Sequence, residues 1–190
     1  MLAIASFTLY NKKLSNDTPM RILTINPGST STKVAVFEDT TPVFTHTLRH
    51  SVEDLSPFTR VSDQFEYRRD LILKMFEEYK VPFEFDVIVS RGGLLKPIEG
   101  GVYRINDQMI SELETPMRNH ASNLGCRIAD DFSRRLGNCP ALTADPGVVD
   151  EMMDEARISG SPLMPRIATW LIPSIAAAPS LVPVCGKVLV

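Results

Sequence analysis

"RILTINPGSTSTKVAVFED", residues 21–39, places two apolar runs on either side of a short polar turn. The runs are Ile22–Ile25 and Val34–Phe37. Both are rich in β-branched residues, which predicts two successive strands, over 21–26 and 32–38. Two residues are enough to turn a chain between paired strands, so the longer loop and its many hydroxyl groups require a further explanation.

The loop has the composition of a phosphate-binding turn. Gly28 allows the backbone to come close to an anion, and the hydroxyl residues Ser29–Ser31 offer hydroxyl and amide donors. Asn26 ends the first strand and adds a neutral polar side chain in the same place. The loop is not a Walker A loop, which has a second glycine before its lysine and leads into a helix. The alternative is a hairpin whose polar residues only face water.

The composition is that of an ordinary globular chain, with 44% hydrophobic residues among 190. A net charge of -3 and a pI near 5.6 give no reason to expect a nucleic acid or an anionic membrane as partner. The three cysteines form no C-x-x-C pair, which favours a reducing compartment, and we expect a cytoplasmic protein.

Strand and helix patterns alternate along the chain and predict a single α/β lobe with a sheet flanked by helices. We expect further strands over 42–48, 85–90, 102–105 and 140–144, and helices over 64–79, 107–114 and 121–136. Gly137 stands where a helix C-terminal cap is expected. The stretch 91–101 is a loop, because it holds four glycines and a proline.

Three further residues are candidates for chemistry. Arg91 directly follows the apolar strand 85–90, at the strand end where α/β sheets place ligand contacts, and its guanidinium suits a carboxylate or a phosphoryl group. His120 precedes a helix, where it can present its ring to an anion. Asp145 ends a strand and can orient a cation. The alternatives are a surface arginine and a structural histidine.

The order of these motifs resembles the acetate and butyrate kinase family, which shares the RNase H-like fold of actin, sugar kinases and Hsp70. The details favour the butyrate kinase branch. The segments that carry the resemblance, over about residues 20–162, are "ILTINPGSTSTKVAVFED" (22–39), "SRGGLLKPIEGGVY" (90–103), "NHASNLG" (119–125) and "DPGVVDEMMDEARISG" (145–160). Acetate kinases instead have a histidine-flanked arginine before the glycine pair and an Asp-Thr-Ala-Phe-His stretch at the later strand end.

The resemblance implies a reversible transfer of phosphate from ATP to butanoate, with Mg²⁺ as the metal ion. It places Asn26 near the phosphoryl group and assigns Arg91 to the substrate carboxylate or that group. It assigns His120 to the substrate pocket, and Asp145 to the magnesium ion, directly or through water, and to the attacking carboxylate. The residues that it places in the phosphate-binding hairpin are Gly28, Ser29, Ser31 and Lys33.

The chain also departs from the family, whose members have a second lobe of similar size. We expect a poorly structured extension over 1–19, a translation start at Met1 or Met20, a lobe over 20–160 and an atypical tail over 161–190. The tail holds five prolines and no acidic residue, so a frameshift or truncation is our hypothesis, and its prolines argue against a membrane-spanning helix.

Several functions stay open at this point. A half-length kinase has no adenosine site of its own, and its exposed lobe interface invites association, so homo-oligomer formation is open. One alternative is a non-catalytic fragment or nucleotide-binding module. Another is a kinase for acetate, propionate or branched short-chain acids. A sugar-kinase-like or Hsp70-like ATPase is disfavoured, because Asn26 stands where such proteins have an aspartate.

Overall fold

The structure, a computed structural model, describes residues 18–96, 98–115 and 119–144, with Pro146, Met153 and residues 188–189. The expected Asp145, most of the extension over 1–19 and nearly all of the tail over 161–190 lie outside the described residues. The strands are β1 (Arg21–Pro27), β2 (Ser31–Glu38), β3 (Thr41–Arg49), β4 (Val87–Arg91), β5 (Val102–Arg104), β6 (Ala141–Ala144) and β7 (Val188–Leu189). The helices are α2 (Val52–Leu55), the 3-10 helix η1 (Val61–Gln64), α3 (Phe65–Glu78), α4 (Asp107–Glu114) and α5 (Asn123–Arg135).

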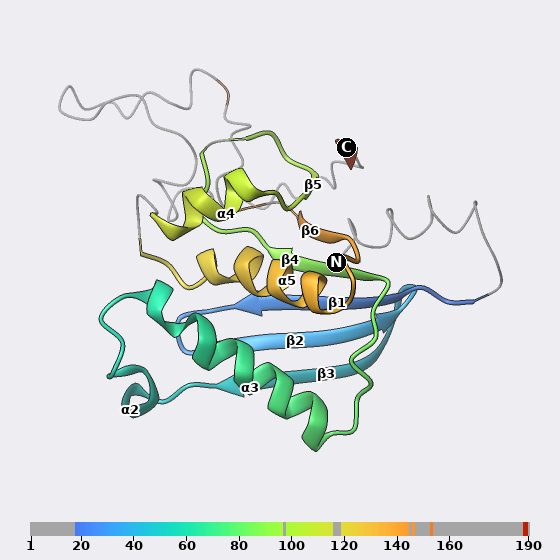
Figure 1. Cartoon of the computed structure of the whole chain (residues 1–190), viewed down its shortest axis with the longest axis horizontal. Coiled ribbons are helices and arrows are strands. Elements are labelled where there is room, and N and C mark those ends of the chain that lie inside the picture. The colour runs from blue at the N-terminus through green and yellow to red at the C-terminus, as the bar shows by residue number, and fades with distance from the viewer. Residues whose placement is uncertain are drawn as a thin grey trace.

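The described strands form one mixed sheet in the order β3-β2-β1-β4-β6-β5-β7 (Figure 1). β1 pairs antiparallel with β2 and parallel with β4, and β4 pairs parallel with β6. The expected fold class, a mixed sheet that opens with antiparallel strands and is flanked by helices, is confirmed. Because β1, β4 and β6 run in the same direction, their carboxyl ends lie side by side. The edge of the sheet named below is this line of strand ends, not one of the outer strands β3 and β7.

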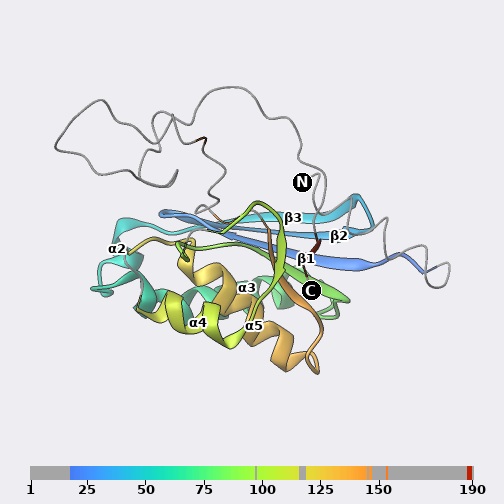
Figure 2. The same cartoon turned by 90° about the horizontal axis from the view of Figure 1, so that it is seen from above.

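The helices α3, α4 and α5 pack on the same face of the sheet (Figure 2). The main core lies between them and the strands and includes Phe132 of α5, which has no exposed surface. Phe132 meets Phe83 edge to face, with the ring centroids 5.1 Å apart. A second, smaller cluster involves Ile22, Val87 and Leu142, and each of the three strands β1, β4 and β6 contributes to it.

The helix ends follow the local sequence. α5 ends before Gly137, whose φ of 74° confirms the expected glycine cap. Sequence analysis missed α2, although its signal is present: Ser51 and Asp54 form a capping box, in which each side chain accepts a hydrogen bond from the other residue's backbone N–H. The helix has only four residues, too few for a periodic pattern. No helix among the described residues is long and apolar enough to span a membrane.

The core predicts a large effect of removing the Phe132 ring. Phe132→Ala leaves a cavity beside Phe83 and should lower the free energy of unfolding by about 3–5 kcal/mol. Urea unfolding followed by circular dichroism measures this loss. Val43→Ala, at a side chain that is 48% exposed, serves as the control and should change it by less than about 1 kcal/mol. Equal effects of the two substitutions would contradict this description of the core.

Candidate phosphate and substrate site

The ends of three strands bring the candidate residues to one edge of the sheet. Ile25 of β1 lies in register with Ser90 of β4, so Asn26 and Arg91 each follow one member of this pair. Arg91 in turn pairs with Ala144 of β6, the residue that precedes Asp145. The side chain of Arg91 is exposed and forms no hydrogen bond or ion pair with another described residue. The guanidinium is therefore available to an anionic ligand at this edge.

The first turn of α5 sits directly on this edge. A Cβ atom on Gly125 would lie 2.6 Å from the carbonyl oxygen of Arg91 and 3.5 Å from Pro27, so only glycine allows the helix to come so close. The amide oxygen of Asn123 also accepts a hydrogen bond from the N–H of Leu94, at 2.8 Å. These contacts hold the loop after Arg91 against the amino end of α5.

The hairpin between β1 and β2 is a tight turn with an exposed tip. The N–H of Gly28 donates to the carbonyl of Ser31 at 2.7 Å. Ser29 and Thr30 are exposed, and so is Lys33, which pairs with Asn26 across the two strands. The loop joins strand to strand, as expected. The hairpin residues and Arg91 therefore come from adjacent strands, and β4 lies next to β1 in the sheet.

Sequence analysis missed Arg68, the residue that holds the hairpin from the inside. Arg68 lies on α3 with no exposed surface. Its Nη1 donates to the carbonyl of Gly28 at 2.8 Å and to that of Ser31 at 3.3 Å, and its Nη2 donates to the carbonyl of Ser29 at 3.1 Å. Nothing in its sequence neighbourhood, "EYRRDL", separates it from Arg69 beside it, whose side chain is partly exposed. Only the tertiary fold distinguishes the two.

A buried histidine extends this polar cluster. Arg68 Nη1 also donates to the hydroxyl of Thr32 at 3.1 Å, and the same hydroxyl lies 2.9 Å from Nε2 of His50. Burial lowers the pKa of His50 from 6.5 to about 4; the Arg68 charge acts in the same direction, and Asp54 opposes it. His50 is therefore neutral in the folded protein at pH 7. Its hydrogen bond with Thr32 gives His50 a structural role in the folded protein.

His120 is exposed and held by its own loop. Its Nδ1 accepts a hydrogen bond from the backbone N–H of Ser122 at 3.2 Å and lies 2.7 Å from the Ser122 hydroxyl. An amide N–H can only donate, so Nδ1 of this ring carries no proton, and the neutral imidazole has its proton on Nε2. His120 can therefore offer Nε2–H as a donor to an oxygen atom of a ligand.

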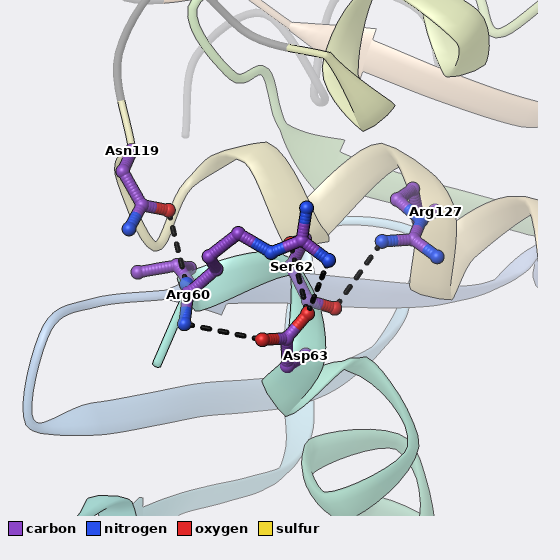
Figure 3. Close-up of polar contacts among 6 residues, drawn as sticks. Arg60, Ser62, Asp63, Asn119 and Arg127 are labelled. Carbon is purple, nitrogen blue, oxygen red and sulfur yellow. Dashed lines mark hydrogen bonds and ion pairs between the residues drawn. The ribbon is translucent and has the colours of Figure 1, made fainter. Parts of the chain in front are cut away.

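The loop that carries His120 is tied to η1 (Figure 3). The side-chain oxygen of Asn119 accepts a hydrogen bond from the N–H of Val61 at 3.0 Å. Arg127 of α5 donates to the carbonyl of Ser62 at 3.4 Å, and its guanidinium lies 4.6 Å from the centre of the Phe65 ring. α5 and the residues just before it are thus attached to η1 at two points, which restricts the position of the His120 loop.

The described residues do not by themselves form a metal site. Among them, no group of three or more His, Cys, Asp or Glu side chains could hold a metal ion. The carboxylate expected to serve magnesium, Asp145, lies outside the described residues, although its neighbour Pro146 is buried close to Gly92.

Comparisons with known proteins bear on the identity of the chain. They confirm its resemblance to the acetate and butyrate kinase family. More specifically, the chain is 54% identical over 151 residues to a probable butyrate kinase of Bacteroides thetaiotaomicron and 47% identical over 148 residues to butyrate kinase 2 of Clostridium acetobutylicum. These matches cover 80% and 77% of this chain. The chain spans less than half of the length of either relative, 43% and 41%. No protein-family model matches it.

Solved structures match this chain more weakly. An acetate kinase of Porphyromonas gingivalis matches with a TM-score of 0.47 and 16% identity, over 75% of this chain and 41% of that one. A Ppx/GppA phosphatase of Aquifex aeolicus matches with a TM-score of 0.45 and 14% identity, over 75% of this chain and 57% of that one.

The contact of α5 with the sheet edge predicts an effect of Gly125→Ala. The added methyl group would collide with the carbonyl of Arg91, so the substitution should lower the free energy of unfolding by about 1–3 kcal/mol. It should also weaken the binding of pyrophosphate, measured by isothermal titration calorimetry, because Arg91 and the His120 loop move apart. Gly137→Ala is the control: its methyl group meets no atom within 4 Å, and its cost of about 1 kcal/mol comes from the positive φ alone. Pyrophosphate binding that stays intact in both variants would contradict the prediction.

The lowered pKa of His50 predicts a pH dependence of stability. Between about pH 6.5 and 4 the unfolded chain binds a proton at this position and the folded chain does not, so stability falls as the pH falls. The loss is about 3 kcal/mol at most. It is measured by urea unfolding at several pH values for the wild type and for His50→Gln, which keeps a polar side chain beside Thr32. The stability difference between the two should change over this range; a constant difference would show that His50 does not titrate as described.

Proposed function

We propose that residues 20–160 form the phosphate- and carboxylate-binding lobe of a butyrate kinase, an enzyme that transfers phosphate from ATP to a short-chain carboxylate. One observation carries this proposal: the hydroxyl-rich hairpin, Arg91 and the amino end of α5 meet at one edge of the sheet. The similarity to proteins named butyrate kinase supports the choice of butanoate among the acids. Acetate, propionate and branched acids remain alternative substrates.

Each residue has a role in this proposal. The hairpin amides and hydroxyls, with Gly28, Ser29, Ser31 and Lys33, bind the phosphate groups of ATP. Arg91 neutralises the transferring phosphoryl group or the substrate carboxylate. His120 donates from Nε2 to an oxygen atom of the substrate.

Two further residues complete the set. Asn26 offers a neutral hydrogen-bonding group next to the transferred phosphoryl group. Asp145 serves the magnesium ion, directly or through water. When bound there, Mg²⁺ would neutralise part of the negative charge of the phosphate groups.

The chemistry needs positioning more than proton transfer. An oxygen of the carboxylate attacks the γ-phosphorus, the new P–O bond forms, and the bond to the bridging oxygen breaks, so that this oxygen leaves with ADP. The carboxylate is already a nucleophile at pH 7, so no general base is required. The rate then depends on holding the two reactants in line and on neutralising the charge of the phosphoryl group.

A nucleotide-binding module without catalysis is the alternative function. It would bind phosphate through the same exposed hairpin residues, Ser29 and Thr30, without the transfer step. We propose a cytoplasmic location in either case.

The test is an assay of the 190-residue chain with Mg-ATP and hydroxylamine, which traps an acyl phosphate as a hydroxamate. Hydroxamate that depends on butanoate, and exceeds that from acetate, propionate and 2-methylpropanoate, supports the kinase. A higher melting temperature with Mg-ATP but no hydroxamate supports the binding module. Neither product nor stabilisation would overturn both functions.

Arg91→Ala should abolish most of the hydroxamate formation, by about 10²–10³-fold, because a fixed positive charge at the phosphoryl group is lost. Arg91→Lys should retain part of the rate, since a lysine keeps the charge but not the paired hydrogen bonds. Arg104→Ala is the control. This exposed arginine is the last residue of β5, which runs antiparallel to β6. It pairs with Leu142, which lies two residues before the carboxyl end of β6. If the chain forms only the binding module, the same three variants are compared by Mg-ATP titration calorimetry. Near-normal values for Arg91→Ala would remove it from the site.

A further inference from the structure

The buried guanidinium of Arg68 has only neutral hydrogen-bond acceptors. Besides three hairpin carbonyls and the Thr32 hydroxyl, it donates to the amide oxygen of Gln64, from Nε at 3.0 Å and from Nη2 at 2.9 Å. No carboxylate of a described residue lies within ion-pair distance of it. Buried charges are normally paired with an opposite charge, so this arginine is an exception.

The same contacts give the hairpin a direction. Arg68 donates hydrogen bonds to the carbonyl groups of Gly28, Ser29 and Ser31, and the backbone N–H of His50 donates to the carbonyl of Thr30. All four carbonyls of the turn therefore have donors from within the protein. The backbone N–H groups of Ser29 and Thr30 donate to no described residue, and both residues are exposed. The turn thus offers donors to solvent while its acceptors are already used, which is the arrangement of an anion site.

We infer that Arg68 is a positioning residue of the phosphate site, and that the phosphate bound on the hairpin supplies the negative charge that this buried arginine lacks. The inference rests on the proposed function of the hairpin and adds a residue that does not itself touch the ligand. Arg68 acts in two ways: its hydrogen bonds keep the hairpin carbonyls turned away from the anion, and its charge attracts the anion through the loop.

A structural arginine and an electrostatic one differ in how they respond to a neighbouring carboxylate. Gln64→Glu keeps the size of the side chain and the two hydrogen bonds, but places a negative charge next to the Arg68 guanidinium. If Arg68 only braces the hairpin, the new ion pair leaves anion binding unchanged or improves it. If its charge serves the ligand, the carboxylate takes the place of the phosphate as counter-ion, and anion binding weakens.

The experiment measures the affinity of the 190-residue chain for inorganic pyrophosphate by titration calorimetry at pH 7.5, with melting temperatures recorded in parallel. Gln64→Glu should melt no lower than the wild type and bind pyrophosphate about tenfold more weakly. Arg68→Met should lose at least as much affinity, and Arg68→Lys should regain part of it. Gln108→Glu, on the exposed face of α4, adds the same charge elsewhere and should change the affinity less than about twofold.

A second control addresses the charge of α3. Arg69→Met removes a neighbouring arginine that pairs with Asp70 and Asp131, and pyrophosphate binding should stay within about twofold. Gln64→Glu keeps the test valid if Arg68→Met fails to fold. Wild-type binding that is unchanged by Gln64→Glu would overturn the electrostatic role of Arg68 and leave the phosphate hairpin in place. A wild type that binds neither pyrophosphate nor Mg-ATP would overturn both.

Discussion

The contact on which the site depends is the approach of α5 to the carbonyl of Arg91. A helix backbone can come this close to a strand end only where it has no side chain, and Gly125 provides that gap. The contact fixes the amino end of α5 beside the ends of β1 and β4. The pairing of β1 with β4 places Asn26 next to Arg91, and the contact of α5 adds the loop that carries His120.

Much of this could be predicted from the sequence, because strands and helices of ordinary length leave periodic patterns. The strands β1–β6 lie within two residues of their expected bounds, and Gly137 marks the end of α5 as expected, whereas β7 was not predicted. The edge could be predicted as well, since Arg91 directly follows an apolar strand. Arg68 could not, because its burial depends on the hairpin that folds over it. The close contact of Gly125 with the Arg91 carbonyl could not be predicted either, because nothing in the sequence distinguishes this glycine from the others.

The polar cluster behind the hairpin replaces apolar packing at a point where apolar packing would be more stable. Burying Arg68, Thr32 and His50 requires a hydrogen-bond partner for almost every polar atom, and a core of leucine and valine would not. What the polar cluster provides is orientation. Apolar side chains fill space without direction, whereas the fork of a guanidinium fixes the carbonyl groups of a loop in one arrangement. The hairpin is thus preorganised at some cost to stability.

The outer edge of the sheet limits how this chain can associate. β3 is the last strand at that side of the described sheet, and its side chains are mostly exposed or half-buried. Pro42 has no N–H to donate, and the pairing register of β2 with β3 shifts between Val36 and Phe37. A second chain that tried to extend the sheet here would find a broken template. On the β3 side, the described sheet is therefore protected against the edge-to-edge pairing through which fibrous aggregates grow.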